Sequence, residues 1–219
     1  MDIAVGRRTM VETQLADRGI ADERVLEAFR AVPREAFVSP ELRKHAFADG
    51  PLDIGLGQTI SQPYVVARMI EAVGENVHGR VLEVGTGSGY AAAILSQLAK
   101  DVVTIERIET LARSAAELLE RLGLASVVVV YGDGSIGYAP RAPYDAILVS
   151  AGGPCVPPSL TRQLAIGGTL VIPVGREVHS QHLVRVTRTA ADSFQAETLD
   201  PVVFVPLIGH EGWAPQSRD

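Results

Sequence analysis

From Arg80 onward, short apolar runs alternate with longer segments in which apolar residues recur every three or four positions. The short runs have the length and the Val, Ile and Leu content of strands buried on both faces. The longer segments have the spacing of amphipathic helices. Strands are therefore expected at 80–84, 102–106, 126–131, 144–150 and 168–174, and helices at 90–100, 109–122 and 158–165.

Upstream of Arg80, the pattern indicates helices and one long loop. A first helix is expected over 5–18, and Asp22 is a suitable N-cap for a second helix over 22–32. Residues 38–62 are rich in proline and glycine, which favour turns. Proline suits the first turn of a helix, so a third helix is expected over 63–73.

Strands that alternate with helices are typical of a parallel sheet with helices on both faces. Residues 182–189 alternate in polarity and 201–206 are apolar, which predicts a closing antiparallel pair. We therefore expect an α/β fold, with a doubly wound, mostly parallel, seven-stranded sheet, an N-terminal helical cap and antiparallel C-terminal strands. Residues 1–219 are expected to form one domain, in which 1–78 are a helical and loop extension and 79–219 are the Rossmann-like core.

Charge and cysteine content narrow the class of protein. The net charge of −6 argues against a broad nucleic-acid surface, because phosphate binding draws on clustered Lys and Arg. Cys155 is the one cysteine, which fits a reducing cytoplasm. The N-terminus has no long apolar stretch after its arginines, and no apolar run approaches a membrane span. We expect a cytoplasmic monomer that binds neither nucleic acid nor a membrane.

Three glycines, Gly85, Gly87 and Gly89, directly follow the expected strand at 80–84. Glycines at this place allow a tight turn and a close approach of the backbone to a ligand. Glu106 ends the next strand, 21 residues after Gly85, where a carboxylate can accept hydrogen bonds from ribose hydroxyls. This order predicts a site for a nucleoside cofactor.

The spacing GxGxG, with Glu83 in the preceding strand, resembles the S-adenosylmethionine (AdoMet) turn of class I methyltransferases. AdoMet carries a cationic amino group and no phosphates, so an acid beside the turn suits it. Asp133, which comes after the third strand, is placed to meet the adenine amine, as an acid does in that family. The alternatives are an NAD-dependent oxidoreductase, whose fingerprint is GxGxxG, and a nucleotide-binding domain without catalysis.

The segment after the fourth strand, SAGGPCVPP, constrains the acceptor. It lacks the Asp/Asn-Pro-Pro-aromatic motif of amino methyltransferases and the carboxylate ligands of metal-dependent catechol methyltransferases. HSQH at 179–182 has two histidines but no third ligand nearby, and Cys155 has no adjacent histidine or basic residue. We therefore expect no metal site and no cysteine chemistry.

Seven blocks of the chain, in order and at the usual spacing, resemble protein-L-isoaspartate O-methyltransferases. GQTISQP at 57–63 and FVPLIG at 204–209 are specific to that family, and the resemblance spans nearly the whole chain. It implies a Rossmann-like methyltransferase that uses AdoMet and releases S-adenosyl-L-homocysteine. It also implies methyl transfer to the α-carboxylate of L-isoaspartyl residues in damaged peptides and proteins, whose ester then closes to a succinimide.

The resemblance also implies roles for individual residues. Ser61 matches the active-site hydroxyl, and because an acceptor carboxylate is already ionised at neutral pH, this hydroxyl is expected to position it. The residues matched to the peptide site are Thr59, Ile60, Gln62, Val205, Pro206 and Leu207. Those matched to the AdoMet site are Glu83, Gly85, Thr86, Gly87, Ser88, Gly89, Glu106, Arg107, Asp133 and Gly134.

The chain departs from the family pattern at a few positions. Phe47 and Asp53 stand where members commonly have Tyr and Pro, and Ser135 begins an atypical segment, 135–143, where many have Trp. These changes leave AdoMet use intact but leave the substrate range open. The alternative is a related enzyme dedicated to one substrate, which methylates an ordinary Asp of a precursor peptide and so installs a succinimide or isoaspartate.

Overall fold

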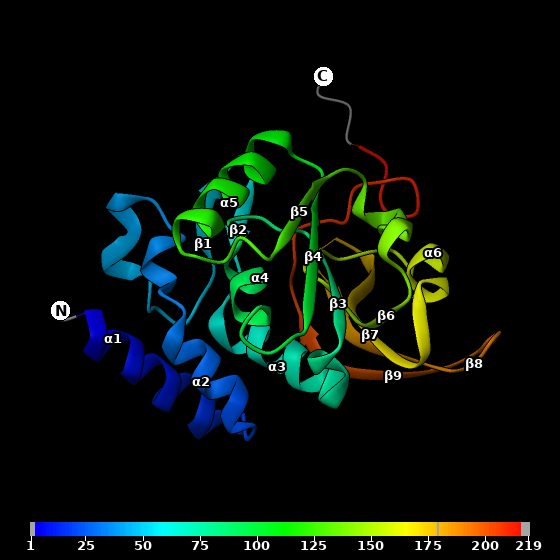
Figure 1. Ribbon diagram of the computed structural model, residues 1–219, viewed down its shortest axis with the longest axis horizontal. Coiled ribbons are helices and arrows are strands. Elements are labelled where there is room, and N and C mark those ends of the chain that lie inside the picture. Colours follow the sequence, from blue (N-terminus) through cyan, green and yellow to red (C-terminus); the bar gives the residue numbers. More distant parts are fainter. Residues whose placement is uncertain (1–2, 179, 216–219) are drawn as a thin grey trace.

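A seven-stranded sheet forms the centre of the computed structural model, which describes residues 3–178 and 180–215 (Figure 1). Its strands are β3 (Arg80–Val84), β4 (Asp101–Glu106), β5 (Val128–Tyr131), β6 (Tyr144–Val149), β7 (Leu164–Glu177), β8 (Ser180–Ala190) and β9 (Ser193–Val202). The order across the sheet is β5-β4-β3-β6-β7-β8-β9. Neighbours from β5 to β7 run parallel, whereas β8 and β9 pair antiparallel, which confirms the expected fold class.

Helices cover both faces of the sheet, more heavily on one face than on the other. The helices are α1 (Ile3–Thr9), α2 (Glu23–Ala31), α3 (Pro63–Val73), α4 (Tyr90–Leu95), α5 (Glu109–Arg121) and α6 (Pro158–Arg162). Shorter helical turns are η1 (Met10–Leu15), η2 (Ala16–Arg18), η3 (Arg34–Ala36), η4 (Pro40–His45), η5 (Gly74–His78), η6 (Gly134–Ile136) and η7 (Ala139–Arg141). None of the helices within the described ranges is long and apolar enough to cross a membrane.

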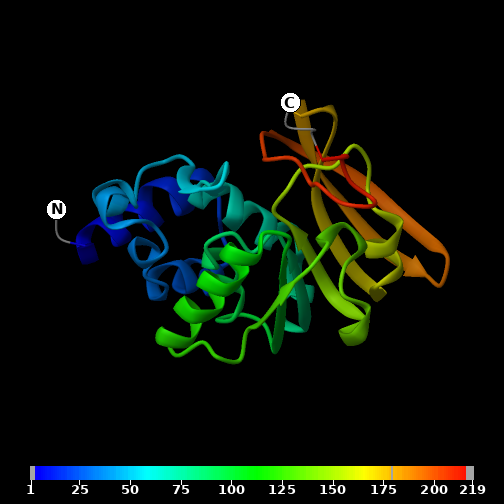
Figure 2. The ribbon, with the colours of Figure 1, turned by 90° about the horizontal axis from the view of Figure 1, so that it is seen from above.

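Successive residues of a central strand belong to different hydrophobic cores. Val81 packs with the N-terminal helices, α3 and α4, whereas Leu82 packs in a second cluster with Leu160 of α6. Both side chains are fully buried, as the continuous apolar run predicts for a strand covered on both faces. Figure 2 shows the blue N-terminal helices and the orange β8–β9 hairpin at opposite ends of the molecule.

The N-terminal helices follow the local signals in the sequence. The carboxylate of Asp22 accepts a hydrogen bond from the backbone N–H of Arg24 (2.9 Å) and caps α2, as predicted. Gly19, with a left-handed φ of 94°, ends the preceding helical segment. α3 runs from Pro63 to Val73, which matches the expected bounds.

The region 38–62, expected to be loop, contains two short strands. Leu52–Gly55 (β1) and Gln58–Ile60 (β2) pair as a small antiparallel sheet around a turn at Leu56 and Gly57. Thr59 is exposed and Ile60 is buried, but this alternation is too short to stand out in a polar sequence. Ser61 and Gln62 follow this hairpin and lead directly into α3.

Three further expectations about bounds are wrong. The helix expected over 158–165 ends at Arg162, and residues 164 and 165 belong to β7. The helix expected over 90–100 ends at Leu95, where the Ser96 hydroxyl donates to the Ala93 carbonyl (2.7 Å). The strand expected over 201–206 corresponds to β9, which spans Ser193–Val202. Of the expected range, only residues 201 and 202 therefore belong to the sheet. Beyond Val202 the backbone leaves β8 and bonds to groups outside the strand ladder.

The order of the strands creates a crevice between β3 and β6. The chain passes from β3 to β4 and β5 on one side, and then returns to β6 on the other side. The loops after β3 and β6 therefore depart in opposite directions, which is where open α/β sheets bind ligands. The Ser150 N–H donates to the Val84 carbonyl (2.8 Å) and keeps the two strand ends together.

Candidate functional site

A cleft opens at the carboxyl ends of β3, β4 and β6. The space between its walls that protein atoms do not fill, open mouth included, is about 740 Å³. The described residues that line it are Gln58, Thr59, Ile60, Ser61, Val66, Glu83, Val84, Gly85, Thr86, Gly87, Ser88, Tyr90, Ala91, Ile105, Glu106, Arg107, Gly134, Ser150, Ala151, Val205, Pro206, Leu207 and Ile208.

The glycine turn forms the floor of the cleft. Gly85, Gly87 and Gly89 have φ values of 95°, 53° and 90°, a region that other residues rarely adopt. The Gly85 N–H continues the ladder by donating to the Ile105 carbonyl (2.9 Å), and Gly89 is the N-cap residue of α4. The turn therefore brings bare backbone against the space that a cofactor would fill.

Glu106 lies at the end of β4 and is tied to this turn. Its Oε2 accepts a hydrogen bond from the Gly87 N–H, and its Oε1 accepts one from the Ile108 N–H, both at 2.9 Å. The residue is 6% exposed and its carboxylate faces the cleft from the strand next to β3. The backbone bonds hold it in one orientation, and its remaining lone pairs can accept hydrogen bonds from a ligand.

Glu83 lies in the cleft, and its surroundings shift its pKa strongly. Its Oε2 accepts a hydrogen bond from the Thr104 hydroxyl (2.6 Å), while its buried Oε1 has no hydrogen-bond partner within the protein. Burial raises the pKa of Glu83 to about 8, against the opposing effect of the Thr104 hydrogen bond. A buried polar atom without a partner is costly, and Oε1 thus offers an acceptor to a donor that enters the cleft.

Asp133 lies outside the set of residues that line the cleft. Its Oδ1 accepts from the Ser135 N–H (2.9 Å) and hydroxyl (2.7 Å), and its Oδ2 accepts from the His210 N–H (2.7 Å). These hydrogen bonds outweigh burial, which alone would raise the pKa of Asp133, and hold it below its ordinary value. Asp133 and the atypical Ser135 therefore fasten the C-terminal segment to the sheet in this structure.

Ser61 lies just after the β1–β2 hairpin, between two hollows of the surface. It lines the cleft, and it also lines a neighbouring groove. The described residues of that groove are Pro51, Thr59, Ser61, Gln62, Val65, Ser150, Ser180, Gln181, His182, Pro201, Val202, Val203, Phe204 and Val205. Thr59, Ser61, Ser150 and Val205 are common to both, so they mark the place where the cleft and the groove meet.

Arg34 supports this junction from the interior. It is fully buried, its Nη2 donates to the Ser61 carbonyl (2.8 Å) and its Nε donates to the Ala46 carbonyl (2.8 Å). The guanidinium also lies 4.7 Å from the ring centroid of Tyr90, whose side chain lines the cleft. Burial lowers the pKa of Arg34, and within the described ranges no carboxylate forms an ion pair with it.

Most residues predicted for the site come together. The cleft contains Ser61, Thr59, Ile60, Glu83, Gly85, Thr86, Gly87, Ser88, Glu106, Arg107, Gly134, Val205, Pro206 and Leu207. Gln62 lines only the groove, and Gly89 and Asp133 line neither hollow. Ser150, Tyr90 and Arg34 were not predicted. The position of Ser150 after β6, at the switch point of the sheet, is a signal that could have identified it.

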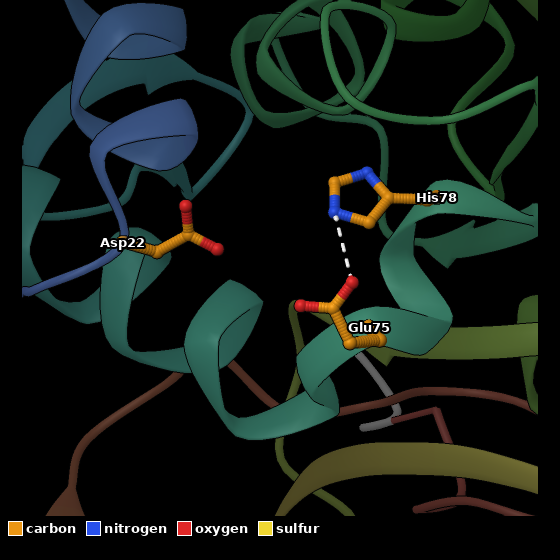
Figure 3. Close-up of side chains that lie close together, drawn as sticks. All are labelled: Asp22, Glu75 and His78. Carbon is orange, nitrogen blue, oxygen red and sulfur yellow. Dashed lines mark ion pairs between the residues drawn. The ribbon is translucent and has the colours of Figure 1, made fainter.

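A second group of titratable side chains lies away from this site. Figure 3 shows Asp22, Glu75 and His78 close together, and one ligand atom from each lies within 4.8 Å of the others. Arg24 already pairs with Asp22 (3.0 Å) and with Glu75 (2.8 Å), so the group is an ion-pair network that joins α2 to η5. Of the HSQH histidines, His182 lines the groove, and His179 lies outside the described residues.

A family model and individual relatives of known name point to the same enzyme family. Residues 6–212 match the family model "Protein-L-isoaspartate(D-aspartate) O-methyltransferase". The chain is 58% identical over 211 residues to protein-L-isoaspartate O-methyltransferase 1 of Rhodopseudomonas palustris strain HaA2, covering 96% of this chain and 86% of the relative. It is 54% identical over 207 residues to protein-L-isoaspartate O-methyltransferase 2 of Pelobacter propionicus, covering 94% and 92% of the two chains.

Solved structures agree with the sequence relatives. A protein-L-isoaspartate O-methyltransferase superimposes with a TM-score of 0.84 at 30% identity, over 94% of this chain and 67% of the other. A Plasmodium falciparum protein assigned to the same activity, solved in complex with S-adenosyl-L-homocysteine, superimposes with a TM-score of 0.79 at 25% identity, over 92% and 98%. Because the family model matches residues 6–212 of the 219, this chain belongs to the protein-L-isoaspartate(D-aspartate) O-methyltransferase family.

Proposed function

We propose that this protein transfers a methyl group from AdoMet to the α-carboxylate of L-isoaspartyl residues in damaged proteins and peptides, and so starts their repair through a succinimide. The observation that carries the proposal is the junction at Ser61. Ser61 lines both the cleft, which contains the glycine turn, and the neighbouring groove. Membership of the O-methyltransferase family indicates that the reaction at this junction is methyl transfer to an oxygen.

The residues of the cleft fit AdoMet. Gly85, Gly87 and Ser88 offer a close backbone surface, and Glu106 offers a fixed carboxylate to ribose hydroxyls. The unpartnered Oε1 of Glu83 suits the amino group of the methionine part, because that group is a cationic donor. When bound, the sulfonium supplies an electrophilic methyl group.

The groove fits an acceptor that is already an anion. A carboxylate of ordinary pKa is ionised at neutral pH, so its oxygen needs no general base. Within the described part of the groove the one titratable side chain is His182, so no carboxylate there repels the acceptor. The hydroxyls of Ser61 and Thr59 and the hydroxyl of Ser150 can donate hydrogen bonds to it without competing charge.

Positioning is then the main task of the protein. Arg34 donates a hydrogen bond to the Ser61 carbonyl, and Val205, Pro206 and Leu207 also line the cleft. Alignment of the acceptor oxygen with the methyl carbon, in a site that excludes water, can supply roughly 7–11 kcal/mol of a reaction barrier. Ser61 acts in this account as a positioning hydroxyl that touches the substrate.

The proposal extends to partners, organisation and location. Its macromolecular partners are isoaspartyl peptides and proteins, and the net charge of −6 favours these over nucleic acid. The extension at 1–78 and the core at 79–219 work as one unit, since both contribute residues to the cleft and the groove. The single cysteine supports a reducing cytoplasm, where the protein acts as a monomer.

The experiment that tests the function is methyl transfer to two matched peptides, which differ only in carrying L-isoaspartate or aspartate at one position. We expect transfer from labelled AdoMet to the isoaspartyl peptide, and base-labile methyl esters as the product. Preference for the aspartyl peptide would contradict repair and favour a dedicated enzyme that installs a succinimide. Inactivity on both peptides would contradict the proposal as a whole.

Replacement of Ser61 by alanine should lower turnover more than cofactor affinity. A hydrogen bond to a charged group contributes about 1.5–3 kcal/mol, so we expect kcat/KM for the isoaspartyl peptide to fall about 10- to 100-fold. The affinity for S-adenosylhomocysteine, measured by calorimetry, should stay within about twofold. Ser96→Ala is the control, because that hydroxyl bonds to the Ala93 carbonyl and the Gln97 side chain at its own helix end, and Ser96 lines neither the cleft nor the groove. Equal losses of turnover and cofactor affinity would place Ser61 in the cofactor site instead.

Glu83→Gln tests the acid beside the turn through pH. In the folded protein the pKa of Glu83 is about 8, above its ordinary value of 4.5, so the folded state holds a proton that the unfolded state releases. The carboxyl therefore costs stability increasingly as pH rises from about 4.5 to about 8, and the substitution should raise the melting temperature more at pH 8 than at pH 5.

The same variant reports on the cofactor. A cationic ligand favours the ionised carboxylate, so binding of AdoMet by the wild-type protein at pH 7 should release a proton, seen as a dependence of the calorimetric enthalpy on buffer ionisation. Glu83→Gln should bind more weakly and should lose that dependence. An unchanged proton release in the variant would show that another group is responsible.

A further inference from the structure

The segment 204–207 forms a wall between the cleft and the groove, although it belongs to no strand. Phe204 lines the groove, Pro206 and Leu207 line the cleft, and Val205 lines both. The chain leaves the sheet at Val202, the last residue of β9. The backbone of this wall therefore needs hydrogen-bond partners other than a neighbouring strand.

The side chain of Gln181 supplies those partners at one end of the wall. Its Oε1 accepts from the Phe204 N–H (2.9 Å), and its Nε2 donates to the carbonyls of Phe204 (3.2 Å) and Val178 (2.6 Å). Bonds to both the N–H and the C=O of one residue are what a neighbouring strand would provide. Gln181 is 2% exposed, so these bonds are made away from water.

Gly152 completes the attachment at the other end. Its N–H donates to the Val205 carbonyl, and its carbonyl accepts from the Leu207 N–H, both at 2.8 Å. A Cβ atom at this position would overlap the side-chain amide of Gln181. The glycine therefore lets the loop after β6 and the Gln181 amide reach the same short segment.

We propose that Gln181 is a positioning residue for the peptide acceptor, and this inference rests on the proposed function. Its amide fixes the backbone at Phe204, and thereby the distance from Val205 to Ser61 across the junction that the acceptor must enter. The role requires one donor and one acceptor on the same neutral group. A carboxylate would keep the acceptor but lose the donor, and an aliphatic side chain would lose both.

Gln163 offers a matched control elsewhere in the chain. It is also buried, its Oε1 accepts from the Tyr138 N–H (2.8 Å), and its Nε2 donates to the Ile136 carbonyl (2.8 Å). It therefore holds a loop by the same kind of contact. Gln163 lines neither the cleft nor the groove.

The test compares Gln181→Leu and Gln181→Glu with Gln163→Leu in the full chain. KM and kcat are measured with the isoaspartyl peptide, affinity for S-adenosylhomocysteine by calorimetry, and stability by thermal melting. We expect the two Gln181 variants to raise the peptide KM about tenfold or more, which is 1.4 kcal/mol of binding, with cofactor affinity within about twofold. Gln163→Leu should lose comparable stability and keep the wild-type KM.

An unchanged KM in both Gln181 variants, or an equal rise in Gln163→Leu, would overturn the inference and leave Gln181 a structural residue. Should Gln181→Leu fail to fold, Gly152→Ala displaces the same amide and is expected to raise KM in the same way. Amide hydrogen exchange at Phe204 separates this inference from the proposed function. A wild-type protein inactive on the peptide refutes the function, whereas unchanged exchange in the Gln181 variants refutes the attachment itself.

Discussion

The divergence of the chain between β3 and β6 is the constraint on which the site depends. Parallel neighbours whose loops leave in opposite directions cannot close the crevice between them. The glycine turn after β3 occupies its floor with backbone alone, and the loop after β6 contributes Ser150 to its rim. Two segments cover the crevice, the β1–β2 hairpin and residues 204–207. Both lie outside the parallel strands, so other parts of the chain must hold them in place.

That fastening relies on polar side chains, of which Arg34 and Gln181 are buried and Asp133 is partly buried. Arg34 holds the Ser61 carbonyl, Gln181 holds the Phe204 backbone, and Asp133 holds the His210 N–H. Polar groups in the interior are costly unless they are hydrogen-bonded, so such contacts are strongly directional once made. Glu83 differs from these because it lies in the cleft itself, where its Oε1 has no hydrogen-bond partner within the described protein. The first three groups shape the site, and the fourth is available to bind.

The features predicted correctly from the sequence are those set by local chemistry. The cap at Asp22, the start of α3 at Pro63 and the buried strand at Arg80–Val84 follow from propensity and periodicity over a few residues. The error over 201–206 arises where groups distant in the sequence decide the structure. The strand expected over 201–206 stops at Val202, because the backbone beyond it forms hydrogen bonds with Gln181 and Gly152. The periodicity of the sequence does not indicate such distant partners. The role of Arg34 was not predicted for the same reason, since its partners Ala46 and Ser61 are distant in the sequence.

The central claim is that Ser61 stands where the cofactor and the acceptor meet. A crystal structure with S-adenosylhomocysteine and an isoaspartyl peptide tests it most directly. We expect the α-carboxylate of the peptide within hydrogen-bond distance of the Ser61 hydroxyl, about 2.5–3.0 Å, with one oxygen directed at the sulfur in the cleft. A carboxylate seated away from Ser61, or a cofactor in the groove instead of the cleft, would contradict the account.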